Sequence, residues 1–101
     1  MMRERIIQEL EKMDAEHSND SAIFFGAIYD YQYIQNHEYE KFSEKLLYVI
    51  RDAIFYRWHD TPANAAKTYC HLCGIDPALI EVFLGKRLDD LANEYIAFAN
   101  S

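Results

Sequence analysis

Two cysteines three residues apart, Cys70 and Cys73, form the spacing in this chain that most suggests chemistry. A Cys-x-x-Cys pair can supply half of a tetrahedral zinc site, and His59 is the best candidate for a third ligand. The sequence has no second cysteine pair and no His-x₃₋₅-His pair to complete the site. A redox role fits less well, because the pair falls in the last turn of an expected helix, where the helix dipole disfavours the thiolate. We therefore expect two small buried thiols, with a zinc site as the alternative.

The run Arg57-Trp58-His59-Asp60 places a histidine beside an aspartate. Neighbours in sequence do not face each other on a helix, so the two side chains would not form an acid/base pair there. No recognisable motif supplies a serine or cysteine nucleophile for them to activate. We interpret the run as the end of a helix, with a histidine in its last turn, followed by a turn.

The carboxylates give a third set that could be considered for hydrolysis. General acid/base catalysis needs a carboxylate held in a cleft with a shifted pKa, whereas these acids fall at helix starts or on polar faces, where they favourably meet the helix dipole. The sequence also has no glycine-rich phosphate loop. We predict a chain that is not an enzyme and uses no cofactor. The acids considered are Glu38, Glu40, Glu44, Asp89 and Asp90.

Composition indicates one folded domain over residues 1–101, because half of the residues are hydrophobic and can bury a core. The formal net charge is −7. Residues 1–50 carry ten acids against five bases, and the rest of the chain carries seven against five. This charge disfavours nucleic acid and favours a protein partner with a basic surface. The apolar runs are too short to span a membrane and no signal core is evident, so we expect a cytoplasmic protein with no membrane partner.

Apolar residues recur at helical spacing from end to end, which predicts an all-α, compact bundle of five to six helices. The central helix is expected over about 38–59, because it is apolar on much of its circumference. Thr61-Pro62 and Asp76-Pro77 are start signals, and Gly74 and Gly85 are stop signals. Further helices are expected over 3–14 and about 88–99.

One segment, 22–35, is ambiguous. Tyr29, Tyr31 and Tyr33 alternate with polar residues as in a strand, yet the segment also traces a helical face. We favour a helix, because no second strand is evident to pair with it. A loop that supplies an N-cap is expected at 18–21, and 36–37 either breaks the helix or continues it.

Aromatic residues are abundant, with eight Tyr, six Phe and one Trp. A domain this small cannot be expected to bury them all, and Tyr and Trp are enriched at protein interfaces. The aromatic side chains that the core would leave over, and two apolar ones on the helix expected from Pro77, are candidates for a docking surface, on a partner or on a second copy of the chain. They are Phe25, Tyr29, Tyr33, Phe55, Tyr56, Leu79 and Val82.

Residues 66–83 resemble the helix-turn-helix of small phage repressor-like domains. The residues that carry the resemblance are Cys70 where the helices cross, Gly74 at the turn, Ile75 after it, and Ile80 and Phe83 facing the core. The resemblance implies a second helix that enters the major groove of DNA. The positions that it would use to read bases hold none of the usual base-reading side chains, and two of them are acidic. They are Asp76, Pro77, Ala78, Glu81 and Val82.

Three functions follow from these patterns. The leading expectation is a non-enzymatic, acidic binding or regulatory module that docks on another protein, with the composition expected of a phage-encoded inhibitor or immunity-type protein. The first alternative is a helix-turn-helix transcriptional regulator using residues 62–87, with Lys67, Lys86 and Arg87 as backbone contacts. The second is a small zinc-binding domain.

Overall fold

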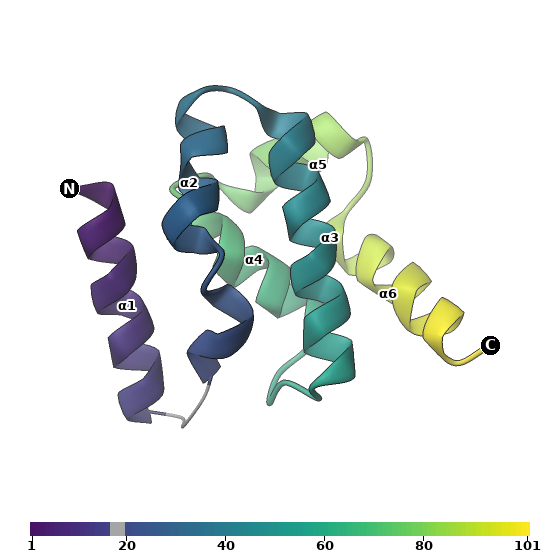
Figure 1. Cartoon of the computed structure of the whole chain (residues 1–101). Helices are drawn as coiled ribbons and strands as arrows, with labels where there is room; N and C mark the ends of the chain where they lie inside the picture. The colour runs from purple at the N-terminus through teal and green to yellow at the C-terminus, as the bar shows by residue number, and fades with distance from the viewer. Residues whose placement is uncertain (17–19) are drawn as a thin grey trace.

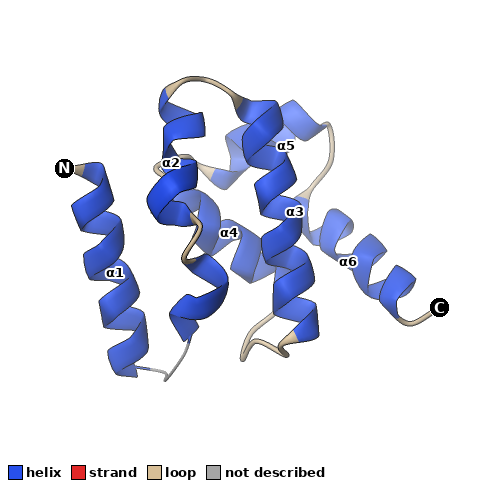
Figure 2. Cartoon of the chain, in the orientation of Figure 1, coloured by secondary structure: helices blue, strands red, loops and turns tan. Residues whose placement is uncertain are grey.

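A long helix near the middle of the chain organises the structure, a computed structural model that describes residues 1–16 and 20–101 (Figure 1). Every regular element in these residues is helical (Figure 2), which confirms the predicted all-α bundle. Of the loop expected at 18–21, residues 18–19 lie outside the described residues, whereas residues 20–21 are helical, so that part of the expectation was wrong. The α-helices are α1 (Met2–Glu16), α2 (Ala27–Gln35), α3 (Tyr39–Phe55), α4 (Pro62–Leu72), α5 (Pro77–Leu84) and α6 (Leu88–Ala99), and a 3₁₀ helix, η1 (Asp20–Phe24), precedes α2.

The helix α3 is central, as expected. It packs most extensively on α4 and also contacts η1, α2, α5 and α6. Its apolar stripe, with Phe42, Leu46 and Ile50 fully buried, faces α4. Because this stripe recurs at helical spacing, burying it against several neighbours supplies most of the stabilisation that such a helix needs. The expected range was too long, since α3 ends at Phe55 and not at His59.

The helices α2 and α3 end in the same way, and neither end contains glycine. After α2, His37 adopts a left-handed φ of 57°, and the Glu38 N–H donates to the Tyr33 carbonyl at 2.7 Å. After α3, Arg57 has a φ of 52°, and the Trp58 N–H donates to the Ala53 carbonyl. This bonding satisfies carbonyls that a helix end would otherwise leave without partners. Residues 36–37 therefore break the helix.

The signals in the last third of the chain are confirmed. The side chains of Thr61 and Asp76 each accept a hydrogen bond from a backbone N–H in the first turn of α4 and α5. Gly74 and Gly85 close these helices with φ of 86° and 68°. Capping fixes where both helices begin and end, and α6 follows over the predicted residues.

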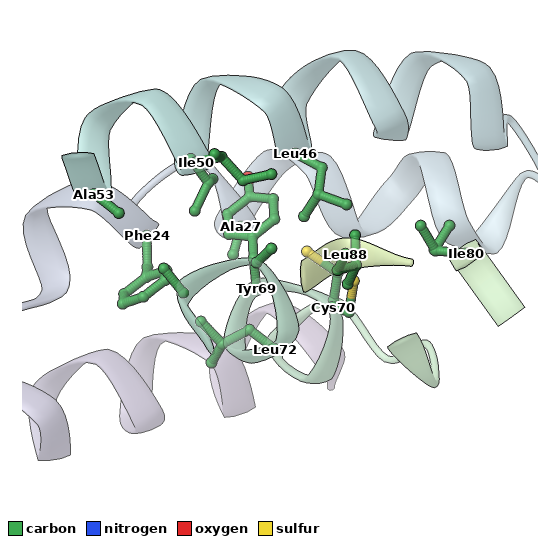
Figure 3. Packing of buried hydrophobic residues seen from close by; sticks show 14 of the residues in the cluster. Phe24, Ala27, Leu46, Ile50, Ala53, Tyr69, Cys70, Leu72, Ile80 and Leu88 are labelled. Atoms are coloured by element: carbon green, nitrogen blue, oxygen red, sulfur yellow. The ribbon is translucent and has the colours of Figure 1, made fainter. Parts of the chain in front are cut away.

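The ambiguous segment is helical and interrupted once, at Phe25–Gly26, between η1 and α2. The reason lies in the core. Tyr69 of α4 is 1% exposed and stacks against Phe24, with ring centroids 6.4 Å apart, while its hydroxyl donates a hydrogen bond to the buried Asp30 carboxylate. Figure 3 shows Tyr69 among the core side chains contributed by several helices. The Gly26 backbone passes directly beside this hydroxyl, where a side chain would not fit.

We expect Gly26→Ala to lower the free energy of unfolding by about 1–3 kcal/mol through overpacking. The backbone at Gly26 suits alanine, with a φ of −56°. A Cβ there would lie 2.8 Å from Tyr69 Oη and 3.1 Å from Asp30 Oδ2. Urea denaturation measures the loss.

The control is Gly85→Ala, where an added Cβ meets nothing within 4 Å. Its cost should come from the left-handed backbone alone, about 1–2 kcal/mol. Removing the hydroxyl with Tyr69→Phe should reduce the cost of Gly26→Ala and leave the cost of Gly85→Ala unchanged. Additive costs of Gly26→Ala and Tyr69→Phe would contradict the proposed clash.

Candidate functional site

Both cysteines are buried in the core. Cys70 is 0% exposed and Cys73 is 1% exposed. Burial raises the pKa of Cys70 to about 12, and it also raises the pKa of Cys73, with the nearby Asp30 carboxylate as a smaller cause. Without a metal the thiols are therefore held protonated, which is the wrong state for a nucleophile. His59, the third residue of the zinc alternative, is exposed and packs its ring on Trp58, and within the described residues no three His, Cys, Asp or Glu side chains converge to hold a metal.

The cysteines give a pH-dependent prediction. An unfolded thiol ionises near pH 9, whereas the folded Cys70 thiol stays neutral to about pH 12. The stability that these neutral thiols contribute is complete below pH 9 and is lost as the pH rises toward 12, because only the unfolded chain then releases its protons. A thiol reagent at pH 8 should label neither cysteine until denaturant unfolds the chain. Rapid labelling of the native protein would contradict this burial.

The run Arg57 to Asp60 is structural in this fold. Arg57 closes α3, and the Asp60 carboxylate accepts hydrogen bonds from the Thr61 N–H at 2.7 Å and from the Asn64 side chain at 3.0 Å. The first of these bonds is the main cause that lowers the pKa of Asp60. The run joins α3 to the start of α4. The His59 ring packs on Trp58, whereas the Asp60 carboxylate binds the first residues of α4 and its cap.

The candidate carboxylates do not form a pair. Glu38 bonds Lys41 at 2.7 Å within one turn of helix, and Glu40 and Glu44 are exposed. Asp89 at the start of α6 forms ion pairs with Lys67 and Arg87, while its neighbour Asp90 is exposed.

The cations considered for DNA contacts are each paired with an acid. Lys67 lies 3.2 Å from Asp89, and Arg87 contacts the same carboxylate at 3.5 Å. Lys86 bonds Glu94 at 2.8 Å. These pairs offset two of the three positive charges, because Lys67 and Arg87 share the Asp89 carboxylate.

The segment resembling a helix-turn-helix consists of α4, a short turn and α5. Cys70, Ile75 and Ile80 are buried, and for Ile80 this is the core position that was expected. Phe83 is not in the core: it is 51% exposed, so that expectation was wrong. Among the base-reading positions, Glu81 turns toward the protein, where its carboxylate accepts a hydrogen bond from the Leu88 N–H at 2.7 Å.

The candidate docking residues are exposed, with one exception. Tyr33 is half-buried and packs against the core. The others do not form one surface, because they lie on three parts of the fold. Phe25 lies just before α2 and Tyr29 lies on it, where the Arg3 guanidinium covers the Tyr29 ring. Phe55 and Tyr56 lie at the end of α3, and Leu79 and Val82 lie on α5.

The helix α5 presents the clearest of these faces, which we call the α5 face: Leu79, Val82 and Phe83. These side chains are 61%, 79% and 51% exposed, whereas Ile80 alone on this helix is fully buried. Phe83 also borders a hollow of about 350 Å³ at the start of α3, where its ring lies 6.0 Å from that of Tyr39.

A second apolar surface includes Phe55 and Tyr56, which were expected from the sequence, and Phe98, which was missed because it continues a core stripe. Phe98 near the end of α6 is 81% exposed. It lines a groove of about 670 Å³ between α3 and α6, together with Phe55 and Tyr56. The one indication of an exposed Phe98 in the sequence was that the apolar stripe of α6 is long for a domain with so small a core.

No family model matches this chain, and neither a curated protein nor a solved structure matches it. None of the described helices has the length and apolar character that crossing a membrane requires. The exposed surfaces of the fold are therefore what indicates the kind of partner that this chain binds.

Proposed function

We propose that this chain is a non-enzymatic binding module that docks the α5 face into a groove on a basic partner protein. The observation that carries the proposal is that α5 has only one fully buried side chain and turns three large apolar ones to solvent. Leu79, Val82 and Phe83 follow an i, i+3, i+4 pattern, which is the pattern of helices that insert into apolar grooves of other proteins.

The acids at the start of α5 and around its hollow favour a basic partner, while Lys86 and Arg87 after α5 are paired with Glu94 and Asp89. Asp76 precedes α5, and Glu38 and Glu40 line the hollow next to Phe83. Lys41 is the one cation lining that hollow, and it is paired with Glu38. A partner groove with an apolar floor and a rim of Lys or Arg would match this surface and would be steered toward it.

The same observations weigh against the two alternatives. A DNA-binding regulator would place α5 in the major groove, where Val82 cannot read base edges by hydrogen bonding and where Lys67 and Lys86 already have acidic partners. A zinc domain would need further ligands beside Cys70 and Cys73, and in the part of the chain that the structure describes no three His, Cys, Asp or Glu side chains converge. The proposal includes that the module, once docked, inhibits or regulates the partner protein.

Capture from a lysate of cells that encode the chain tests the proposal. The wild-type protein is compared with a double variant, Leu79→Ser with Val82→Ser, and with the matched exposed-aromatic control Phe25→Ser. We expect the wild type and the control to retain one basic protein at low salt and to release it as salt is raised. The double variant should not retain it. Equal retention by the double variant would refute docking through α5.

A further inference from the structure

The apolar stripe of α6 runs beyond the core that it packs on. Leu88 and Ala92, in the first half of the helix, are 0% and 2% exposed. Tyr95 is half-buried, and Phe98, one turn later, is 81% exposed. Figure 1 shows the C-terminal end of α6 extending away from the bundle. A helix face that continues its apolar pattern past its own core is unpartnered in the monomer.

The end of α3 presents a matching set of rings to this unpartnered face. Phe55 and Tyr56 are 77% and 67% exposed and meet edge to face, with centroids 4.9 Å apart. Together with Ile54 and the outer half of α6 they line the groove of about 670 Å³. The surface therefore offers both a hollow and protruding rings, which is what a self-complementary interface requires.

We propose that this groove binds the same groove of a second copy of the chain, in a two-fold symmetric dimer. The inference extends the proposed function, since it assigns α3–α6 to self-association and leaves α5 for the partner. In such a dimer Phe98 of one copy inserts beside Phe55 and Tyr56 of the other, and each contact occurs twice.

Charge complementarity favours a second copy over a basic partner at this groove. Its charged lining residues are Arg51 and Asp52, one of each sign, so the groove is neutral in a chain with a formal net charge of −7. Two like-charged copies meet with least repulsion at a neutral patch. A basic partner would gain nothing from this patch and would meet Arg51.

The surface area that the aromatic rings would bury between two copies fits a weak dimer. Phe55, Tyr56 and Phe98 from two copies would cover on the order of 900 Å². Stable interfaces bury about 1,200 Å² or more in total, and the remaining groove lining can supply the difference. The dimer should therefore be reversible and concentration-dependent.

Sedimentation velocity of the purified full chain over about a hundredfold range of concentration tests the inference. We expect the mass to rise from one copy to two. Raising the salt should strengthen association, because it screens the repulsion between two acidic copies, whereas docking on a basic partner should be weakened. Phe98→Ser should weaken the dimer about tenfold or more. Phe25→Ser, which removes an exposed ring outside the groove, should leave it unchanged.

A single-copy mass at every concentration would overturn the inference, and so would a Phe98→Ser variant that dimerises like the wild type. If the Leu79→Ser, Val82→Ser double variant loses the dimer while Phe98→Ser keeps it, the second copy binds at α5 and the assignment is wrong. Far-ultraviolet circular dichroism confirms that each variant is folded. Because the test uses the pure chain alone, its outcome is independent of whether α5 captures a partner.

Discussion

Replacing Tyr69 with alanine is expected to lower the free energy of unfolding by about 3–5 kcal/mol. Tyr69 is 1% exposed and stacks on both Phe24 and Phe42, with ring centroids 6.4 and 5.8 Å away. Removing the ring opens a cavity where η1, α3 and α4 meet. Small domains have roughly 5–15 kcal/mol of stability in total, so this variant should be close to unfolding at room temperature. Urea denaturation followed by circular dichroism measures the change.

Tyr69→Phe separates the hydroxyl from the ring. The Tyr69 hydroxyl donates to the Asp30 carboxylate, which is only 8% exposed. Without that donor a buried acceptor is left unsatisfied, at a cost of about 1–3 kcal/mol. Tyr48→Phe, at a position that is 53% exposed, is the matched control and should change stability by less than about 0.5 kcal/mol. Equal stability of the two phenylalanine variants would show that the Asp30 bond contributes nothing.

Serine at Leu79 or Val82 is expected to weaken partner binding about 30-fold or more, the effect of losing a hot-spot side chain worth about 2 kcal/mol. Both side chains are largely exposed, so the free energy of unfolding should change by only about 0.5 kcal/mol. Isothermal titration of the captured partner against each variant measures the binding loss. Phe98→Ser, in the separate α3–α6 groove, should bind the partner like the wild type.

The salt dependence of this binding tests whether the partner has a basic surface. The partner's affinity for the wild type should fall as salt rises, because acids such as Glu40 and Asp76 attract its basic rim. Val82→Ser should bind more weakly at every salt concentration and keep the same dependence, since it removes apolar contact and no charge. An affinity that does not respond to salt would contradict a basic partner.

Much of the fold could be predicted from the sequence because its signals are local. Thr61-Pro62, Asp76-Pro77, Gly74 and Gly85 place the ends of α4 and α5 through caps and left-handed backbone that each need only a few neighbouring residues. The ends of α2 and α3 were not predictable in this way. His37 and Arg57 take a left-handed conformation that non-glycine residues adopt uncommonly, and no glycine marks these helix ends in the sequence.

The candidate surfaces could be predicted only in part. Leu79 and Val82 were named because they are apolar on a helix without base-reading side chains, and they are exposed, whereas Phe83 and Phe98 lie at core spacing and are exposed nonetheless. Spacing fixes the face of a helix that a residue occupies, but the extent of the neighbouring helices decides whether that face is covered. The two-turn α5 fully buries Ile80 alone and adds only the half-buried Leu84, and α6 extends past its neighbours (Figure 1).

Site-specific photo-crosslinking tests the central claim most directly, because it reports what touches the α5 face in the folded chain. A photoreactive side chain is placed at Val82 and, in a separate protein, at the exposed position Gln8 of α1. In lysate of the encoding cells, position 82 should crosslink to one basic protein, with a yield that falls as salt rises. Position 8 should not crosslink to it. Crosslinks to that protein from position 8 but not 82, or to nucleic acid from position 82, would contradict docking on a protein through α5.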